Sequence, residues 1–138
     1  LEETGMGFSK EVEAINIANT LDILTMPFVF NEFEAELMCN AGADIIIAHM
    51  GCTSGGQIGV KSYIGLDKCI AKIQAIIDTV KKINSDIIIL CQGGPINSPK
   101  EAEYIFKNID HLDGFCGASS LERIPIESAV TKTIKKFT

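Results

Sequence analysis

Two glycine-rich segments of this chain could bind a phosphate group. Gly93-Gly94 and Gly117-Ala118-Ser119-Ser120 each follow a run of apolar residues. Glycine lets the main chain approach a ligand closely, and successive N–H groups beside a helix start favour an anion. The amides of Gly94, Ala118 and Ser119, together with the serine hydroxyls, are therefore the predicted phosphate ligands. The same glycines could instead serve only as tight turns.

Three other side chains could take part in chemistry near these turns. His49 ends an aliphatic run and could act as a general base or an electrophile, although a lone histidine is more often structural. Cys91 directly precedes the first segment's turn and is a candidate thiol nucleophile, but no His or Asn partner is visible. Arg123 could bind a phosphate or a carboxylate through its planar guanidinium, or could pair with Glu122 or Glu127.

Adjacent acidic residues near the start of the chain could supply an acid or a metal ligand. Glu2 and Glu3 precede the first predicted helix, and Glu3 is the candidate catalytic residue of the pair, although two neighbouring carboxylates are usually only solvated. The sequence contains no zinc-binding spacing, no P-loop lysine and no G-x-G-x-x-G after a first strand. The cofactor therefore stays unknown: a divalent metal is compatible with phosphate chemistry, but no ligand set is visible.

Helices and strands alternate along the chain, and this order positions the candidate residues. Helices are predicted at residues 10–20, 31–40, 67–83, 99–108 and 125–137, and strands at residues 23–30, 44–49, 86–91 and 112–116. Strand 44–49 is apolar without alternation, which is typical of strands buried on both faces of a parallel sheet. Residues 50–65 form the longest irregular stretch, and long loops inside compact domains are usually functional.

Local signals define the ends of several predicted helices. Ser9, Asn31 and Asp67 are placed to cap the first three helices, and Gly42 should end the second. The third helix has apolar side chains at helical spacing, which predicts the face that packs on a sheet. These side chains are Cys69, Ile73, Ile76, Ile77, Val80 and Ile83.

Alternating strands and helices predict an α/β fold with a parallel sheet and right-handed crossovers. A doubly wound sheet and a (β/α)8 barrel both fit this order, but glycine-rich loops after several strands favour the barrel, where every strand ends at one rim. Four strands correspond to the C-terminal half of such a barrel, so residues 1–138 are predicted to form a single partial TIM-barrel domain. Barrels frequently hold a phosphate in their last two loops, which here are the two glycine-rich segments.

Composition excludes several classes of protein. The 138 residues are 46% hydrophobic and 22% charged, as in one globular domain, and no apolar run approaches the roughly 20 residues of a membrane span. No signal peptide is visible. The net charge of −6, with scattered basic residues, argues against nucleic-acid binding. Five cysteines without C-x-x-C spacing indicate reduced thiols and a cytoplasmic protein.

Four segments together resemble a known family. They are Leu1-Glu2-Glu3-Thr4-Gly5-Met6-Gly7-Phe8, Ala48-His49-Met50-Gly51 with Thr53 and Gly55-Gly56, Gln92-Gly93-Gly94-Pro95-Ile96, and Gly114-Phe115-Cys116-Gly117-Ala118-Ser119-Ser120-Leu121-Glu122-Arg123-Ile124-Pro125. They closely resemble the phosphoenolpyruvate-hydrolase-like TIM-barrel family, whose barrel also forms the C-terminal half of plant tobamovirus-resistance proteins. The resemblance spans essentially the whole chain. It implies a TIM barrel with a phosphate-type site, although the acidic metal-binding motif of phosphonopyruvate hydrolases is not found here.

Two functional hypotheses follow. The first is a hydrolase- or lyase-type enzyme acting on a small phosphorylated or phosphono carboxylate, bound through Gly93, Gly94, Gly117, Ala118, Ser119, Ser120 and Arg123, with His49, Glu3 or Cys91 as catalytic residues. The alternative is a non-catalytic module that binds a ligand or a protein. Four parallel strands would leave open edges and an uncovered face, so a homo-oligomer or association with the missing half-barrel is also expected.

Overall fold

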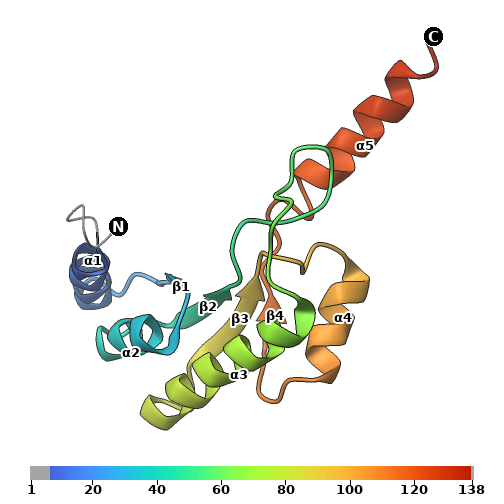
Figure 1. Cartoon of the computed structure of the whole chain (residues 1–138). Helices are drawn as coiled ribbons and strands as arrows, with labels where there is room; N and C mark the ends of the chain where they lie inside the picture. The colour runs from blue at the N-terminus through green and yellow to red at the C-terminus, as the bar shows by residue number, and fades with distance from the viewer. Residues whose placement is uncertain (1–6, 138) are drawn as a thin grey trace.

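The structure is a computed structural model that describes residues 7–137, and within them four strands alternate with five helices (Figure 1). The strands are parallel, so the α/β class predicted from sequence is confirmed. The elements are α1 (Ser9–Thr20), β1 (Phe28–Val29), α2 (Glu32–Asn40), β2 (Ile45–His49), α3 (Leu66–Ile83), β3 (Ile88–Gln92), α4 (Pro99–Lys107), β4 (Gly114–Phe115) and α5 (Arg123–Ile134).

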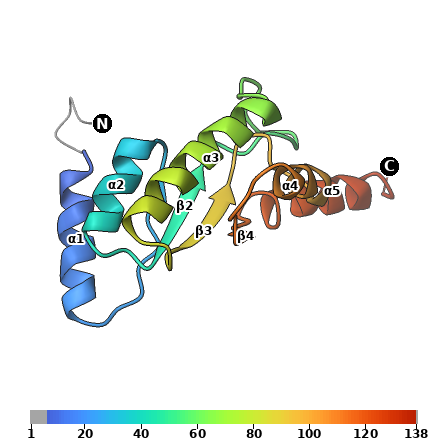
Figure 2. The ribbon, with the colours of Figure 1, turned by 90° about the horizontal axis from the view of Figure 1, so that it is seen from below.

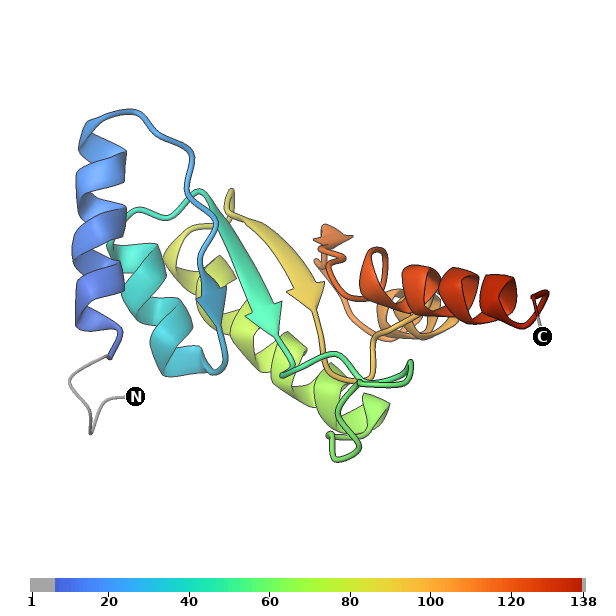
Figure 3. The same cartoon turned by 90° about the horizontal axis from the view of Figure 1, so that it is seen from above.

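The strands stand in the sheet in the same order as in the sequence, β1-β2-β3-β4. This order does not reverse among the described strands, so they lack the switch point of a doubly wound sheet. Helices α1, α2 and α3 lie side by side on one face of the sheet (Figure 2). Figure 3 shows β2 and β3 from their other face, over which no helix of the described chain lies.

The core lies between the sheet and this helical layer. Ile46 and Ile89 point from the two central strands toward α3 and are fully buried. The helix contributes the stripe predicted from its spacing, of which Cys69, Ile73, Ile76, Ile77 and Val80 are buried. Successive side chains of a strand point to opposite faces of the sheet, so the alternate residues point to the face without helices, called the open face below. On this open face Phe28 is 44% and Ile88 is 46% exposed.

Two of the predicted helix signals act as expected. The Asn31 side chain accepts a hydrogen bond of 2.9 Å from the Glu34 N–H at the start of α2, and the Glu34 carboxylate accepts one of 2.6 Å from the Phe30 N–H. Gly42 adopts a φ of +90° after α2 and donates its N–H to the Cys39 carbonyl. Glycine reaches this left-handed conformation without steric cost, so it ends the helix.

Two predicted caps are wrong. Ser9 is the first residue of α1 and follows Phe8 as N-cap, with no side-chain cap bond. Asp67 lies within the first turn of α3, which begins at Leu66, and it accepts a hydrogen bond of 2.9 Å from the Tyr104 hydroxyl of α4. Because the carboxylate binds this neighbouring helix, it joins α3 to α4 and does not cap its own helix.

The first strand is much shorter than the predicted residues 23–30. Thr25 and Pro27 still accept hydrogen bonds from β2 through their carbonyls, but proline has no N–H to return. Thr25 instead donates its N–H and its hydroxyl to the Asp44 carboxylate at 2.7 and 2.9 Å. These bonds hold the pKa of Asp44 below its usual value and fasten the segment before β1 to the start of β2.

Candidate functional site

The carboxyl ends of the four strands place one side chain each in a row on the open face of the sheet. His49 and Gln92 are register partners at the ends of β2 and β3. Extending the register by one residue sets Phe30 beside His49 and Cys116 beside Gln92. The turn 117–120 follows Cys116 directly, so the sheet brings His49, Gln92 and this turn to one rim.

The His49 imidazole is held in a defined tautomer. Its Nδ1 accepts a hydrogen bond of 3.1 Å from the Gly51 N–H, so the ring proton of the neutral form lies on Nε2. Phe28 and Phe30 pack against the ring with centroid separations of 5.1 Å each. Their burial of the ring lowers the pKa of His49. The neutral imidazole can therefore donate a hydrogen bond from its Nε2–H. This corresponds to the electrophilic role and not to the role of general base.

Gln92 is the residue of the rim that the sequence prediction missed. Its side chain is only 7% exposed, and its Oε1 accepts no hydrogen bond from any described residue. Buried polar groups in folded proteins are nearly always paired, so this amide is an exception that requires a ligand or a water. The sequence did contain a signal for this residue, because Gln92 is a polar residue at the end of an apolar strand. Its position opposite His49, however, depends on the register of two strands.

The turn after β4 has the properties expected of an anion site. The N–H groups of Gly117, Ala118, Ser119 and Ser120 have no acceptor among residues 7–137, and the two serine hydroxyls likewise have no partner there. The turn is half-buried. Four consecutive unpaired amides at the start of a helical segment can together bind an anionic group.

The other predicted phosphate loop has a structural role, which corrects the prediction. Gly93 and Gly94 are buried with φ of +81° and +58°, and a Cβ on either would collide with the backbone of Met50 or Gly51. The Gly94 N–H donates to the Gly51 carbonyl at 2.8 Å. This amide is therefore not available to a phosphate, and the two glycines allow the loops after β2 and β3 to cross.

Arg123 is used to hold the loop after β2, the pairing alternative considered from sequence. Its guanidinium donates to the carbonyls of Thr53 and Gly55 and to the Glu127 carboxylate at 2.8 Å. Glu127 in turn accepts the Gln57 N–H at 2.6 Å, and these two contacts hold the pKa of Glu127 below its usual value. Residues 53–57 are thus fastened to α5 by charged groups, and Arg123 does not point a free guanidinium at the rim.

Comparison with known proteins agrees with the resemblance seen in the sequence. The family model described as phosphoenolpyruvate hydrolase-like matches residues 1–138. The chain belongs to the phosphoenolpyruvate hydrolase-like family. Two relatives from Solanum lycopersicum are the ToMV susceptible protein tm-1(GCR26), 50% identical, and the ToMV resistance protein Tm-1(GCR237), 49% identical, each over 137 residues. The match covers 99% of this chain but 18% of each tomato protein, so the chain spans less than a fifth of their length.

Among solved structures, a nitroalkane oxidase from Streptomyces ansochromogenes is similar with a TM-score of 0.43 and 23% identity. The alignment covers 80% of this phosphoenolpyruvate hydrolase-like chain and 31% of the oxidase.

The position of Cys91 argues against the nucleophilic role that was considered from the sequence. Its side chain lies on the helix-covered face of the sheet and is fully buried in the core. Burial raises the pKa of the thiol to about 12. Because the thiolate is the reactive form, the Cys91 sulfur is both inaccessible and unreactive near neutral pH.

The remaining predicted catalytic residue, Glu3, lies outside the described residues, as does Glu2. Within residues 7–137, no group of three or more His, Cys, Asp or Glu side chains is arranged to hold a metal ion. The helices of the same part of the chain include none that is long and apolar enough to cross a membrane.

The described part of this phosphoenolpyruvate hydrolase-like chain also has a cleft of about 830 Å³ that the sequence did not predict. It lies between the starts of α3 and α4 and the loop before α3. Four of its polar side chains pair with one another: Asn97 donates to Ser54 at 2.9 Å, and Tyr104 donates to Asp67 at 2.9 Å. The rim with its unpaired amides is therefore the better candidate site.

Proposed function

We propose that this chain binds a small phosphorylated or phosphono carboxylate, such as phosphoenolpyruvate or phosphonopyruvate, at the rim of its sheet and acts on it as a hydrolase- or lyase-type enzyme in the cytoplasm. The observation that carries the proposal is the buried, unpaired Oε1 of Gln92 between His49 and the turn 117–120. An unsatisfied buried amide costs about 1–3 kcal/mol, a cost that a ligand contact would offset. Membership of the family supports the ligand class.

Each group at the rim has a role in this proposal. The four amides and two hydroxyls of turn 117–120 bind the phosphate or phosphonate oxygens. The Nε2–H of His49 donates to the carboxylate or carbonyl oxygen of the ligand, and Gln92 Oε1 accepts from a ligand hydroxyl or from the water used in hydrolysis. In that reaction the water oxygen bonds to phosphorus, the bond from phosphorus to carbon or oxygen breaks, and the leaving group is protonated.

The same proposal includes the architecture of the whole domain. We infer that the sheet is the C-terminal half of a (β/α)8 barrel whose other strands belong to a longer protein. Three features support this inference: the sequential strand order, the helices on one face, and the apolar open face that a closing barrel would cover. The site would then be shared between the two halves.

Binding measurements test the site. We expect Ser119→Asp to weaken the binding of inorganic phosphate and phosphonopyruvate at least tenfold in calorimetry, because a carboxylate in the turn repels the anion. Ser128→Asp adds the same charge on the exposed side of α5 and should leave affinity unchanged. If both variants bind phosphate as the unmodified chain does, the turn is not the site.

Gln92→Met provides a second test with two opposite effects. It removes the unsatisfied amide at similar volume, so the ligand-free protein should gain about 1 kcal/mol in urea unfolding, while affinity for phosphonopyruvate should fall. A loss of stability instead would mean that Gln92 has a structural partner and is not reserved for a ligand.

The alternative function is a non-catalytic module that recognises an anionic ligand or a protein. It is supported by the names of the tomato relatives, a ToMV resistance and a ToMV susceptible protein, and by the assignment of Arg123 and Cys91 to structural roles. Phosphate release from phosphoenolpyruvate or phosphonopyruvate that His49→Ala abolishes would favour the enzyme. Binding without turnover in the longer protein would favour the module.

A further inference from the structure

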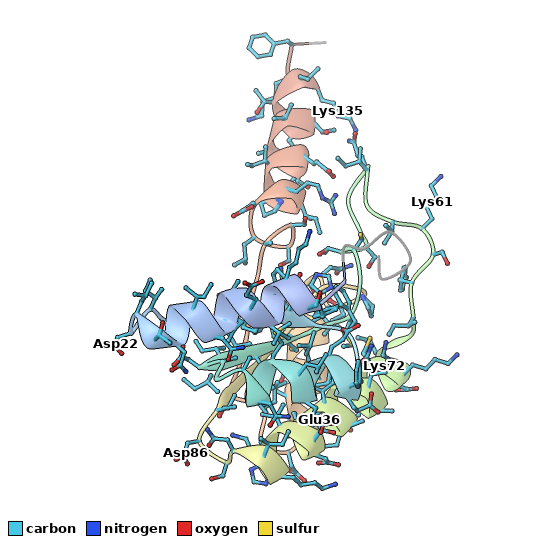
Figure 4. The ribbon with its side chains drawn as sticks, turned by 90° about the vertical axis from the view of Figure 1, so that its left-hand side faces the viewer. Asp22, Glu36, Lys61, Lys72, Asp86 and Lys135 are labelled. Carbon is cyan, nitrogen blue, oxygen red and sulfur yellow. The ribbon has the colours of Figure 1, made fainter. Side chains whose placement is uncertain are left out.

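The loop after β2, residues 50–65, stands beside the start of α5. Figure 4 shows this loop, with Lys61 on its outer limb, extending from the body in the same direction as α5, which ends next to Lys135. Asp86, at the opposite ends of the strands, lies far from both. Hydrogen bonds join the loop to α5 across about 70 residues of sequence, so two distant segments meet at the rim.

Residues 51–57 of this loop are bound first to the loop after β3. The Gly51 carbonyl accepts the Gly94 N–H at 2.8 Å, and the Ser54 N–H donates to the Gly94 carbonyl at 2.9 Å. The Asn97 side chain adds a hydrogen bond of 2.9 Å to the Ser54 hydroxyl. This segment is therefore a fixed part of the rim and not a free connection.

The start of α5 holds the rest of the segment. Arg123 donates to the carbonyls of Thr53 and Gly55 at 3.3 and 3.1 Å, and it pairs with Glu127 at 2.8 Å. The Glu127 carboxylate accepts the Gln57 N–H at 2.6 Å. A planar guanidinium presents several N–H groups at once, so a single arginine can bind two carbonyls and a carboxylate together.

The turn 117–120 is part of the same rigid piece as Arg123. The carbonyls of Ala118 and Ser119 accept hydrogen bonds of 2.9 to 3.0 Å from N–H groups within residues 121–124. These bonds continue the turn directly into the first turn of α5. The side chain that holds the loop therefore extends from the backbone that a bound anion would contact.

The held segment also supplies the amide that orients His49. The Gly51 N–H donates to His49 Nδ1 at 3.1 Å, and Gly51 is itself bound by Gly94. Arg123 binds the backbone two and four residues after Gly51. A continuous path of contacts therefore leads from turn 117–120 through Arg123 to the imidazole.

We propose that Arg123 is a positioning residue of the rim, which couples the occupation of turn 117–120 by an anion to the orientation of His49 through segment 51–57. The inference rests on the proposed function, because it needs an anion in that turn. A bound anion fixes the backbone from which Arg123 extends, so the loop becomes more ordered when the ligand binds. Such coupling is reciprocal, and loosening the loop weakens anion binding by the same factor.

The loop offers a matched pair of glycine substitutions. A Cβ on Gly56 would collide with the Arg123 guanidinium and the Glu127 carboxylate, and the φ of +72° at Gly56 disfavours a side chain as well. Gly65, in the same loop, has open space where its Cβ would stand and an ordinary φ of −68°. Gly56→Ala should therefore loosen segment 51–57 without touching the turn after β4, whereas Gly65→Ala should not.

Hydrogen exchange, calorimetry and NMR on the intact protein measure the coupling, with inorganic phosphate and phosphonopyruvate as probes. We expect either probe to increase the protection of amides 51–57 and to move the nitrogen signal of His49 Nδ1. Gly56→Ala should weaken the binding of both probes about fivefold or more and remove both responses. Gly65→Ala should behave as the unmodified protein does.

A second variant and a second outcome keep the test decisive. Arg123→Lys keeps the charge but loses the planar fork, so it should weaken phosphate binding as Gly56→Ala does, and it replaces that variant if Gly56→Ala does not fold. If Ser119→Asp abolishes phosphate binding while folded Gly56→Ala and Arg123→Lys proteins bind phosphate normally, the turn is the site and the positioning role is wrong. If the unmodified protein binds neither probe, the proposed function fails, and this inference fails with it.

Discussion

His49 and Gln92 illustrate how position in the sheet decides what a side chain can do. Both end apolar strands, and both point from the open face at the rim. The imidazole is fixed by one backbone amide and two aromatic rings, whereas the Gln92 amide oxygen has no partner in the described chain. Cys91, one residue earlier, points into the core and is inert. The face of the sheet to which a side chain points therefore determines its possible chemical role as much as its residue type does.

The lowered pKa of His49 predicts how stability depends on pH. The unfolded chain takes up a proton near the ordinary histidine value of 6.5, while the folded chain does so only at lower pH. The unfolded state therefore binds more protons as pH falls through 6.5, so the free energy of unfolding should decrease there and level off below the folded pKa. Urea unfolding at pH 7.5, 6.5 and 5.5 measures this.

His49→Gln should remove this part of the pH dependence while keeping a hydrogen-bonding side chain at the position. The contribution from Asp44, whose pKa is also lowered, falls in a separate window below its ordinary value of 3.8 and should persist in the variant. An equal slope near pH 6.5 in both proteins would show that His49 is not buried as described.

At the scale of elements, α3 and α5 show two different uses of an apolar helix. The stripe of α3 lies on the sheet and forms the centre of the core. Ile126, Val130 and Ile134 of α5 are each more than half exposed in the described part of the chain, while the polar side of the same helix binds the loop after β2. The spacing of apolar residues predicts that a helix has a face to bury, but the direction of the helix determines what buries it.

The α3 stripe predicts a difference between two isoleucines of the same helix. Ile76 is fully buried, so Ile76→Ala should lower the free energy of unfolding by about 2–5 kcal/mol through lost burial and the cavity left behind. Ile83, at the end of the stripe, is 40% exposed, and Ile83→Ala should cost less than about 1 kcal/mol. Equilibrium urea unfolding compares them, and equal losses would contradict the packing of α3.

At the scale of the whole molecule, the open face of the sheet is an apolar surface that no described helix covers. Phe28 and Ile88 belong to the parity that points away from the helices, and both are nearly half exposed. Contiguous apolar surface of this kind usually marks an interaction site. In the proposed barrel this face would become the interior, next to the rim residues.

This open face predicts dye binding that depends on chain length. The 138-residue chain should enhance the fluorescence of an apolar dye, and Phe28→Ser with Ile88→Ser should reduce that signal with little loss of stability, because both side chains are already partly in water. Ile58→Ser, at an exposed residue of the loop after β2, is the control. A longer protein that closes the barrel should show little enhancement, and strong enhancement there would argue against closure.

The sequence by itself determined the alternation of helices and strands, the parallel sheet, the capping of α2 by Asn31 and the face of α3 that is buried. These features depend on residues within one or two turns of each other or on hydrophobic period, so local chemistry is sufficient. The family was also evident from short motifs. Of the candidate site, the turn 117–120 and His49 at a strand end could be predicted in the same way.

Only the tertiary structure decided what the glycines and charges do. Gly93 and Gly94 allow the loop after β3 to pass close to Gly51 in the loop after β2. Arg123 binds the carbonyls of Thr53 and Gly55, about 70 positions away in the sequence. Gln92 became a candidate site residue through its register with His49 and because its Oε1 has no partner among the described residues. Each of these assignments depends on contacts between distant segments or on which face a strand presents, and neither is encoded in local spacing.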